Sequence, residues 1–103
     1  MAMIATPTNR VFVSAASNWE IAIKRRTGKL SFSGSPGHAV TANSFVELVI
    51  SGADCELAGN LDWIHNDPFD RMIIAQAQAR GMTLITADAN MQKFIGVAIV
   101  AAT

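Results

Sequence analysis

The sequence predicts an α/β fold in which a mostly parallel sheet is flanked by helices. Short β-branched and apolar segments alternate with segments that carry helical spacing and helix-capping residues, a pattern typical of strands joined by helices. Half of the 103 residues are hydrophobic and only 16% are charged, which excludes a disordered tail or linker. The sequence contains no repeat and no linker, so we expect one domain over residues 1–103, with a poorly defined N-terminal segment at residues 1–10.

The first predicted strand is Val11–Val13, a β-branched and aromatic run. A helix is expected over about Asn18–Arg26, where apolar residues recur at helical spacing. The glycine- and serine-rich segment Ser33–Gly37 predicts a loop, and a short helix is expected around His38–Asn43. The segment Phe45–Ile50 has the composition of a second strand.

The second half begins with a predicted helix over Ser51–Leu61, which has glycines near both ends. The clearest helix is Pro68–Arg80, because Asp67 stands at the N-cap, proline at the first turn and Gly81 just past the end. Three further elements are expected: a strand at Met82–Thr86, a short helix at Ala89–Phe94 and a final strand at Val97–Ala101.

Charge and cysteine content restrict the function. Eight lysines and arginines balance eight aspartates and glutamates, so a nucleic-acid site must be local rather than a global positive field. The single cysteine, Cys55, permits no internal disulfide and no cysteine-based zinc site, and we expect it to be a buried hydrophobe. No apolar run reaches the roughly 18 residues of a membrane span, and the first ten residues lack the pattern of a signal peptide. We therefore expect a soluble cytoplasmic protein.

Carboxylates are few, and they occur where predicted helices begin. Glu20 lies in the helix after the first strand, Asp67 and Asp70 open the long helix, and Asp88 follows a strand by two residues. Because ligands bind at the carboxyl ends of strands in open α/β sheets, we expect Glu20 and Asp88 at one rim, with Asp70 beside them. Clustered carboxylates suit a hard cation such as Mg²⁺ or Mn²⁺, which can polarise a phosphate and generate hydroxide. The residues alone thus indicate a metal-dependent phosphodiesterase.

Each acid also has a purely structural interpretation. Ser17 and Glu20 have the spacing of a capping box, as do Asp67 and Asp70, and Asp88 can cap the last short helix. Acids near helix N-termini gain about 0.3–1 kcal/mol from the helix dipole. Spacing alone favours capping for each residue, although capping and metal binding can coexist.

Other candidates have two interpretations as well. His65 can contact a phosphate, or it can pack or cap the following helix. Trp19 and Trp63 are expected to be core or interface anchors rather than platforms on which bases stack. A basic cluster can follow an RNA backbone or form a solvated helix face; it consists of Lys24, Arg25, Arg26 and Lys29.

Several segments resemble the PIN-domain toxins of the VapC type. The run VFVSAASNWEIAIK at residues 11–24, followed by GKL at residues 28–30, resembles the second strand and following helix of these toxins. The run HNDPFDRMIIAQA at residues 65–77 is similar to their most recognisable stretch. The run LITAD at residues 84–88, followed by Phe94, resembles their last acidic turn, and Val97–Val100 their closing strand. The resemblance covers about Asn9–Ala101.

This resemblance implies a PIN-like fold and Mg²⁺- or Mn²⁺-dependent endoribonuclease activity on RNA, with a small cognate antitoxin as partner. Carried over by position, Glu20, Asp70 and Asp88 match the second, third and fourth active-site acids, whose roles are catalysis and metal coordination. Asp67 lies beside the third acid and is a further candidate metal ligand. Arg71 is expected to support the site or to pair with an acid, and His65 is expected to support the site.

The resemblance also implies an N-terminally truncated domain. Family members open with an apolar strand that ends in the first metal-binding aspartate, whereas no residue before Glu20 is acidic here. The strand that the resemblance leaves out normally lies in the middle of the sheet, so its loss would expose unpaired backbone groups. Three completions are open: a homodimer or domain-swapped oligomer, local closure by Met1–Thr6, or a truncated product that folds differently. One carboxylate fewer is expected to weaken metal binding.

Three functional hypotheses follow. The first is a metal-dependent endoribonuclease toxin of a toxin–antitoxin pair, which hydrolyses RNA phosphodiesters. The second is a catalytically weakened PIN remnant that acts by binding antitoxin or by dimerising with full-length toxin. The third is a small α/β phosphoryl-handling domain unrelated to PIN domains.

Overall fold

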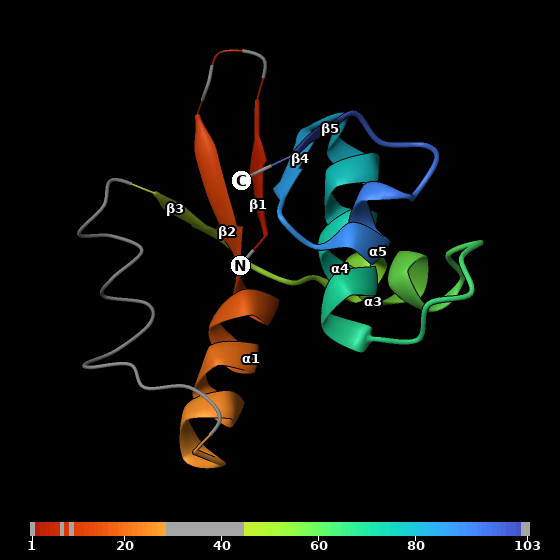
Figure 1. Cartoon of the computed structure of the whole chain (residues 1–103). Helices are drawn as coiled ribbons and strands as arrows, with labels where there is room; N and C mark the ends of the chain where they lie inside the picture. The colour runs from red at the N-terminus through yellow and green to blue at the C-terminus, as the bar shows by residue number, and fades with distance from the viewer. Residues whose placement is uncertain (1, 7, 9, 29–44, 102–103) are drawn as a thin grey trace.

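The fold is a five-stranded sheet flanked by helices, in a computed structural model that describes residues 2–6, 8, 10–28 and 45–101 (Figure 1). The strands are β1 (Met3–Ala5), β2 (Val11–Ser14), β3 (Val46–Leu48), β4 (Thr83–Thr86) and β5 (Ile99–Ala101). The helices are α1 (Ala15–Arg26), α3 (Gly52–Gly59), α4 (Pro68–Arg80) and α5 (Ala89–Gln92). The loop expected at Ser33–Gly37 and the helix expected at His38–Asn43 lie outside the described residues.

The strand order is β3-β2-β1-β4-β5, and four of the strands run in the same direction. The pairs β2–β3 and β4–β5 are parallel, whereas β1 is antiparallel to both of its neighbours, β2 and β4. The prediction of a mostly parallel sheet with flanking helices is therefore confirmed, with one reversed strand at its centre.

The N-terminal residues Met3–Ala5 form the central strand β1 of the sheet. Ile4 is paired with Phe12 on one side and with Leu84 on the other, so the short apolar run fills the middle of the sheet. The pairing of β1 with β2 extends to the next residues, since the Thr6 N–H donates to the Arg10 carbonyl at 3.0 Å. Of the three completions, local closure by the N-terminal segment is the one that the structure contains.

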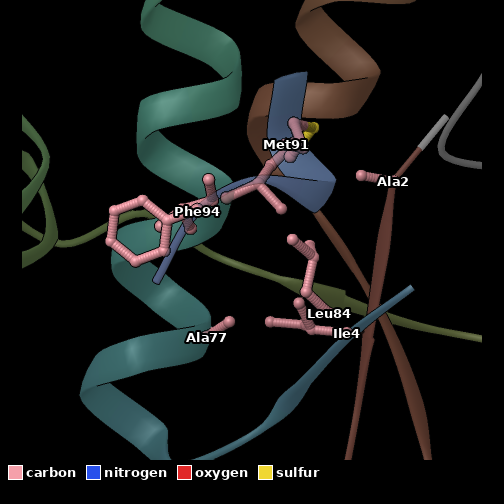
Figure 2. Packing of buried hydrophobic residues seen from close by; sticks show 8 residues of the cluster. Ala2, Ile4, Ala77, Leu84, Met91 and Phe94 are labelled. Atoms are coloured by element: carbon pink, nitrogen blue, oxygen red, sulfur yellow. The ribbon is translucent and has the colours of Figure 1, made fainter. Parts of the chain in front are cut away.

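The core lies between the central strands and α4. Ile4 and Leu84 project from neighbouring strands toward Ala77 of α4, with Met91 and Phe94 closing the same space (Figure 2). Ile4 is only 1% exposed, and burying such a side chain contributes about 1.5–3 kcal/mol. The three residues of β1 are thus held by apolar burial as well as by backbone pairing.

Capping residues set the helix boundaries. Asp67 Oδ1 accepts from the N–H groups of Phe69 and Asp70, and Gly81 ends α4 in the left-handed conformation at φ 62°, so the predicted bounds of this helix are confirmed. The helix predicted from Asn18 begins earlier, because Ser14 caps it by accepting from the Ala16 N–H at 3.1 Å.

No helix in the described ranges has the length and hydropathy needed to cross a membrane.

The remaining elements are shorter than their sequence patterns suggested. The strand expected at Phe45–Ile50 is β3 and covers only Val46–Leu48. Helix α3 ends at Gly59 rather than at Leu61. Strand β4 begins at Thr83, α5 ends at Gln92 and β5 begins at Ile99. Such shifts of one or two residues are ordinary at the ends of elements.

The buried side of α3 carries one acid, Asp54, together with Ala58. The expectation that Cys55 is a buried hydrophobe is wrong, because its side chain is exposed. The neighbouring Asp54 is buried instead, since its carboxylate accepts hydrogen bonds from Arg80 and Gln76 of α4.

Candidate active site

A cleft of about 200 Å³ lies at the edge of the sheet where β2 and β4 end. Helix α1 starts directly after β2, and two residues separate the end of β4 from the start of α5. The antiparallel β1 begins at this same edge, so Ala2 also lines the cleft. Four acidic residues line it, here called the cleft acids: Glu20, Asp67, Asp70 and Asp88. The geometry agrees with the prediction that Glu20 and Asp88 share one rim with Asp70 beside them.

Glu20 reaches the cleft from the second turn of α1. Its predicted capping box with Ser17 is wrong, because the helix begins at Ala15 and Ser14 is the cap. One Glu20 oxygen instead lies 3.3 Å from the ammonium group of Lys24, one helical turn further on. Such an exposed i,i+4 pair contributes only about 0.3–0.5 kcal/mol, so this interaction holds the glutamate weakly.

The cleft acids at the start of α4 are differently engaged. Asp67 caps the helix through Oδ1 alone, and its second oxygen has no hydrogen bond among the described residues. Asp70, at the third helical position, does not complete a capping box; its Oδ2 lies 3.0 Å from His65 Nε2. The Asp70 side chain is only 13% exposed. His65, which the sequence left between a phosphate contact and a packing role, thus holds a cleft acid.

Asp88 caps α5 and lines the cleft at the same time. Its Oδ1 accepts from the Met91 N–H at 3.0 Å, and its own N–H donates to Thr86 Oγ1 at 3.0 Å. Gln92 fixes the same turn by donating to the Thr86 carbonyl at 2.7 Å. Capping and exposure to the cleft therefore coexist in this residue.

The surroundings of Asp70 disfavour its ionised carboxylate. Burial raises the pKa of Asp70; the hydrogen bond from His65 opposes this, and the charges of Asp67, Asp88 and Glu20 raise the pKa further. Lys24 is the one cationic residue among the described residues that line the cleft. The cleft thus gathers more negative charge than its own side chains neutralise, and a bound cation would relieve the repulsion.

The side-chain atoms that could bind a metal ion form a close group and a more distant pair. Among the described residues, His65, Asp67 and Asp70 form the one group of three whose ligand atoms all lie within 4.8 Å of one another. Glu20 and Asp88 line the same cleft but are not part of this close group. The two acids of α4 are therefore brought together most tightly, and the other two surround them at a greater distance.

Arg71 fixes the segment that precedes α4. Its guanidinium donates to the backbone carbonyls of Ala58 at 2.9 Å, Leu61 at 2.7 Å, Trp63 at 2.7 Å and His65 at 3.1 Å. It makes no ion pair with an acid in the described part of the chain, so pairing is not its role there. The Trp63 ring also lies 4.8 Å from the His65 ring. Arg71 therefore positions His65, and through it the carboxylate of Asp70.

The central strand brings no carboxylate to the rim. The register of β1 with β4 pairs Met3 with Ile85, which places Ala2 beside Thr86 at the mouth of the cleft. The side chain that lines the cleft next to the central strand is therefore the methyl group of Ala2. All carboxylates of the cleft come from α1, from the start of α4 and from the start of α5.

Together, the fold and the cleft define an α/β protein with an acidic site at the carboxyl edge of its sheet. The family model for the PIN domain matches residues 2–96, so the chain belongs to the PIN domain family. No curated protein and no solved structure matches the chain significantly. A PIN domain implies a nuclease, generally a metal-dependent one.

Two features of the site were missed in the sequence. The contact of Lys24 with Glu20 was available from their i,i+4 spacing on a predicted helix. The position of Ala2 had no local signal, because it follows from the pairing of β1 with a strand about 80 residues away. Long-range pairing of this kind cannot be inferred from a three-residue apolar run.

Proposed function

We propose that this protein is a metal-dependent endoribonuclease that hydrolyses RNA phosphodiesters and acts as the toxin of a toxin–antitoxin pair. One observation supports the nuclease activity most directly: the chain belongs to the PIN family, and its four cleft acids line one cleft. The toxin role, the RNA substrate and the cognate antitoxin are supported by the resemblance to VapC-type toxins.

The donor set of the cleft fits Mg²⁺ or Mn²⁺. Every acid offers hard carboxylate oxygens, and no cysteine lines the cleft among the described residues. Asp70 and Asp67 would hold the ion most closely, with Glu20 and Asp88 completing the set. A bound Mg²⁺ or Mn²⁺ supplies polarisation of the phosphate and activation of water.

The chain's own residues prepare this site. His65 Nε2 orients Asp70 Oδ2, and Arg71 holds the backbone of His65. Asp67 presents its second oxygen, because only Oδ1 is used in capping α4. Lys24 lies at the cleft beside Glu20 and can donate to a non-bridging phosphate oxygen when the substrate enters. These contacts reduce the reorganisation needed to bind a phosphodiester.

Cleavage of a mixed RNA by the purified chain tests the proposal. We expect cleavage that requires Mg²⁺ or Mn²⁺, stops with a chelator, and falls at least about 100-fold in Asp70→Asn and Asp88→Asn, since even partners of metal ligands matter 10- to 100-fold. Asp62→Asn is the matched control, because this aspartate is exposed and does not line the cleft. Cleavage that persists in both cleft variants would contradict the proposed site.

The rim position of Ala2 favours a second candidate function. We propose as this alternative a catalytically weakened PIN remnant that binds antitoxin or a second PIN chain, because the central strand brings no acid to the cleft. A folded chain that binds Mn²⁺ without cleaving RNA would favour it. Sedimentation of the chain alone, and mixed with a candidate antitoxin, then measures whether it forms a homodimer or a heteromeric complex.

A further inference from the structure

A second cleft, of about 290 Å³, adjoins the acidic one along α1 and the start of α4. Three residues line both clefts, which makes the two continuous: Glu20, Lys24 and Asp67. The rest of the second cleft is largely apolar and consists of Ile23, Thr27, Pro68 and Phe69. A ligand bound with a phosphate in the acidic cleft can therefore place a neighbouring group here.

Trp19 provides an aromatic surface next to this second cleft. It is 61% exposed, although tryptophan is usually well buried. Of the two expected roles, core anchor or interface anchor, the core role is therefore wrong, and the interface role stays a prediction. Its ring meets the ring of Phe69 edge to face, with centroids 5.1 Å apart and planes at 81°. Trp63, by contrast, is partly buried and packs against the core. The arrangement holds the indole in place while leaving much of its surface in solvent.

The second cleft combines an apolar part with charged residues of both signs, Lys24 as the cation and Glu20 and Asp67 as the acids. The last turn of α1 contains Lys24, Arg25 and Arg26, and Lys24 itself lines the cleft. Glu20, Asp67 and Thr27 add a polar rim, so the apolar part is small and enclosed by ionic groups. A flat aromatic group on a negatively charged backbone matches both parts, and these are the features of a nucleotide in single-stranded RNA.

We propose that Trp19 and the second cleft form a subsite for one nucleobase of single-stranded RNA, directly beside the scissile phosphate. The base stacks on Trp19 or against Phe69, and Lys24 binds the phosphate between the two clefts. This subsite rests on the proposed nuclease function and assigns Trp19 to substrate binding rather than to the chemical step.

Fluorescence of Trp19 tests the subsite directly. The sequence has two tryptophans, so Trp63→Phe leaves Trp19 as the single indole. In chelator, which prevents cleavage, we expect a single-stranded oligoribonucleotide to quench this fluorescence saturably. An oligonucleotide of the same length without bases should bind about 5- to 150-fold more weakly, the range for loss of one stacked base. Equal quenching by both oligonucleotides would overturn the proposal.

Kinetics separate this subsite from the cleavage site. Trp19→Ala should raise KM by about 5- to 150-fold with little change in kcat, and Trp19→Phe should restore most of the affinity. Ile95→Ala is the matched control, because this side chain is 93% exposed and lines neither cleft. Circular dichroism verifies that each variant is folded.

The two proposals fail in different ways. If the nuclease proposal fails, no variant cleaves RNA, while quenching of Trp19 by oligoribonucleotide still supports the subsite. If the subsite fails, Asp70→Asn abolishes cleavage and Trp19→Ala leaves KM unchanged. A dimer that dissociates in Trp19→Ala, with oligonucleotide affinity unaltered, would show that a second copy of the chain occupies this surface and would overturn the proposal.

Discussion

Asp54 and Asp70 are both largely buried at helix α4, but they lie in opposite electrostatic surroundings. Asp54 meets the C-terminal part of the helix, where the guanidinium of Arg80 donates at 3.1 and 3.2 Å and Gln76 Nε2 donates at 3.3 Å. Burial alone would raise the pKa of Asp54; hydrogen bonds from Arg80, from the Ser51 N–H and from Gln76 outweigh it and lower the pKa to about 2. Asp70 meets three other carboxylates, and its pKa is raised.

This difference teaches which acid is structural and which is available for chemistry. A buried carboxylate that serves stability is surrounded by donors, as Asp54 is. Among the described residues Asp70 has one donor, His65, and the neighbouring carboxylates repel it. Groups held against such repulsion in a cleft are characteristic of functional sites, because a ligand supplies the missing interaction.

Removing the charge of the structural acid should have the largest effect on stability. We expect Asp54→Asn to lower the free energy of unfolding by about 2 kcal/mol, since the pKa falls from 3.8 to about 2 and one unit corresponds to about 1.4 kcal/mol. For a domain of this size the melting temperature should fall by roughly 10 °C. Urea denaturation measures this, with Glu56→Gln on the exposed face of α3 as the matched control. Unchanged stability would show that Arg80 does not stabilise Asp54.

A divalent cation should stabilise the repulsive end of α4 and not the other end. At about ten times its dissociation constant, Mn²⁺ is expected to raise the free energy of unfolding by about 1.4 kcal/mol. The gain should persist in Asp54→Asn and disappear in Asp70→Asn. Thermal unfolding across a Mn²⁺ titration measures it. A gain that survives in Asp70→Asn would place the cation elsewhere.

Sequence reasoning was most successful where local signals were dense. Asp67, Pro68 and Gly81 together define both ends of α4, and the structure confirms these bounds. The common rim of Glu20 and Asp88 followed from the rule that parallel strands end at a common edge, which needs no distances. Their roles in metal binding and catalysis remain predictions.

The parts that sequence reasoning left open or missed depend on contacts between distant residues. Strand β1 is three residues long, and only its partners β2 and β4 make it a strand. The buried state of Asp54 depends on Arg80, which is 26 residues away. Arg71 was expected to assist the site, but its donation to backbone carbonyls of the preceding segment has no sequence pattern, because backbone acceptors are present at every residue.

Acid should weaken the structural end of α4 through Asp54. Because its pKa in the folded protein lies below its ordinary value of 3.8, the stabilisation is complete well above that value and is lost as the pH falls toward about 2. Between pH 7 and pH 3 we expect this residue to account for about 1 kcal/mol of the loss in stability. Denaturation of the parent and Asp54→Asn at both pH values isolates the contribution. Parallel losses in the two proteins would contradict it.

The smallest effect, and one of opposite sign, is expected for Asp70 without metal. A raised pKa means that the folded state disfavours the ionised carboxylate, so stability from this group is present at low pH and lost as the pH rises through its folded pKa. Asp70→Asn keeps a polar group beside His65 and removes the repelled charge. In chelator at pH 7 its free energy of unfolding should equal or slightly exceed that of the parent. The variant would then lose cleavage without losing stability, which a structural acid such as Asp54 cannot do. Marked destabilisation would instead assign Asp70 to the fold, with its bond to His65 as the reason.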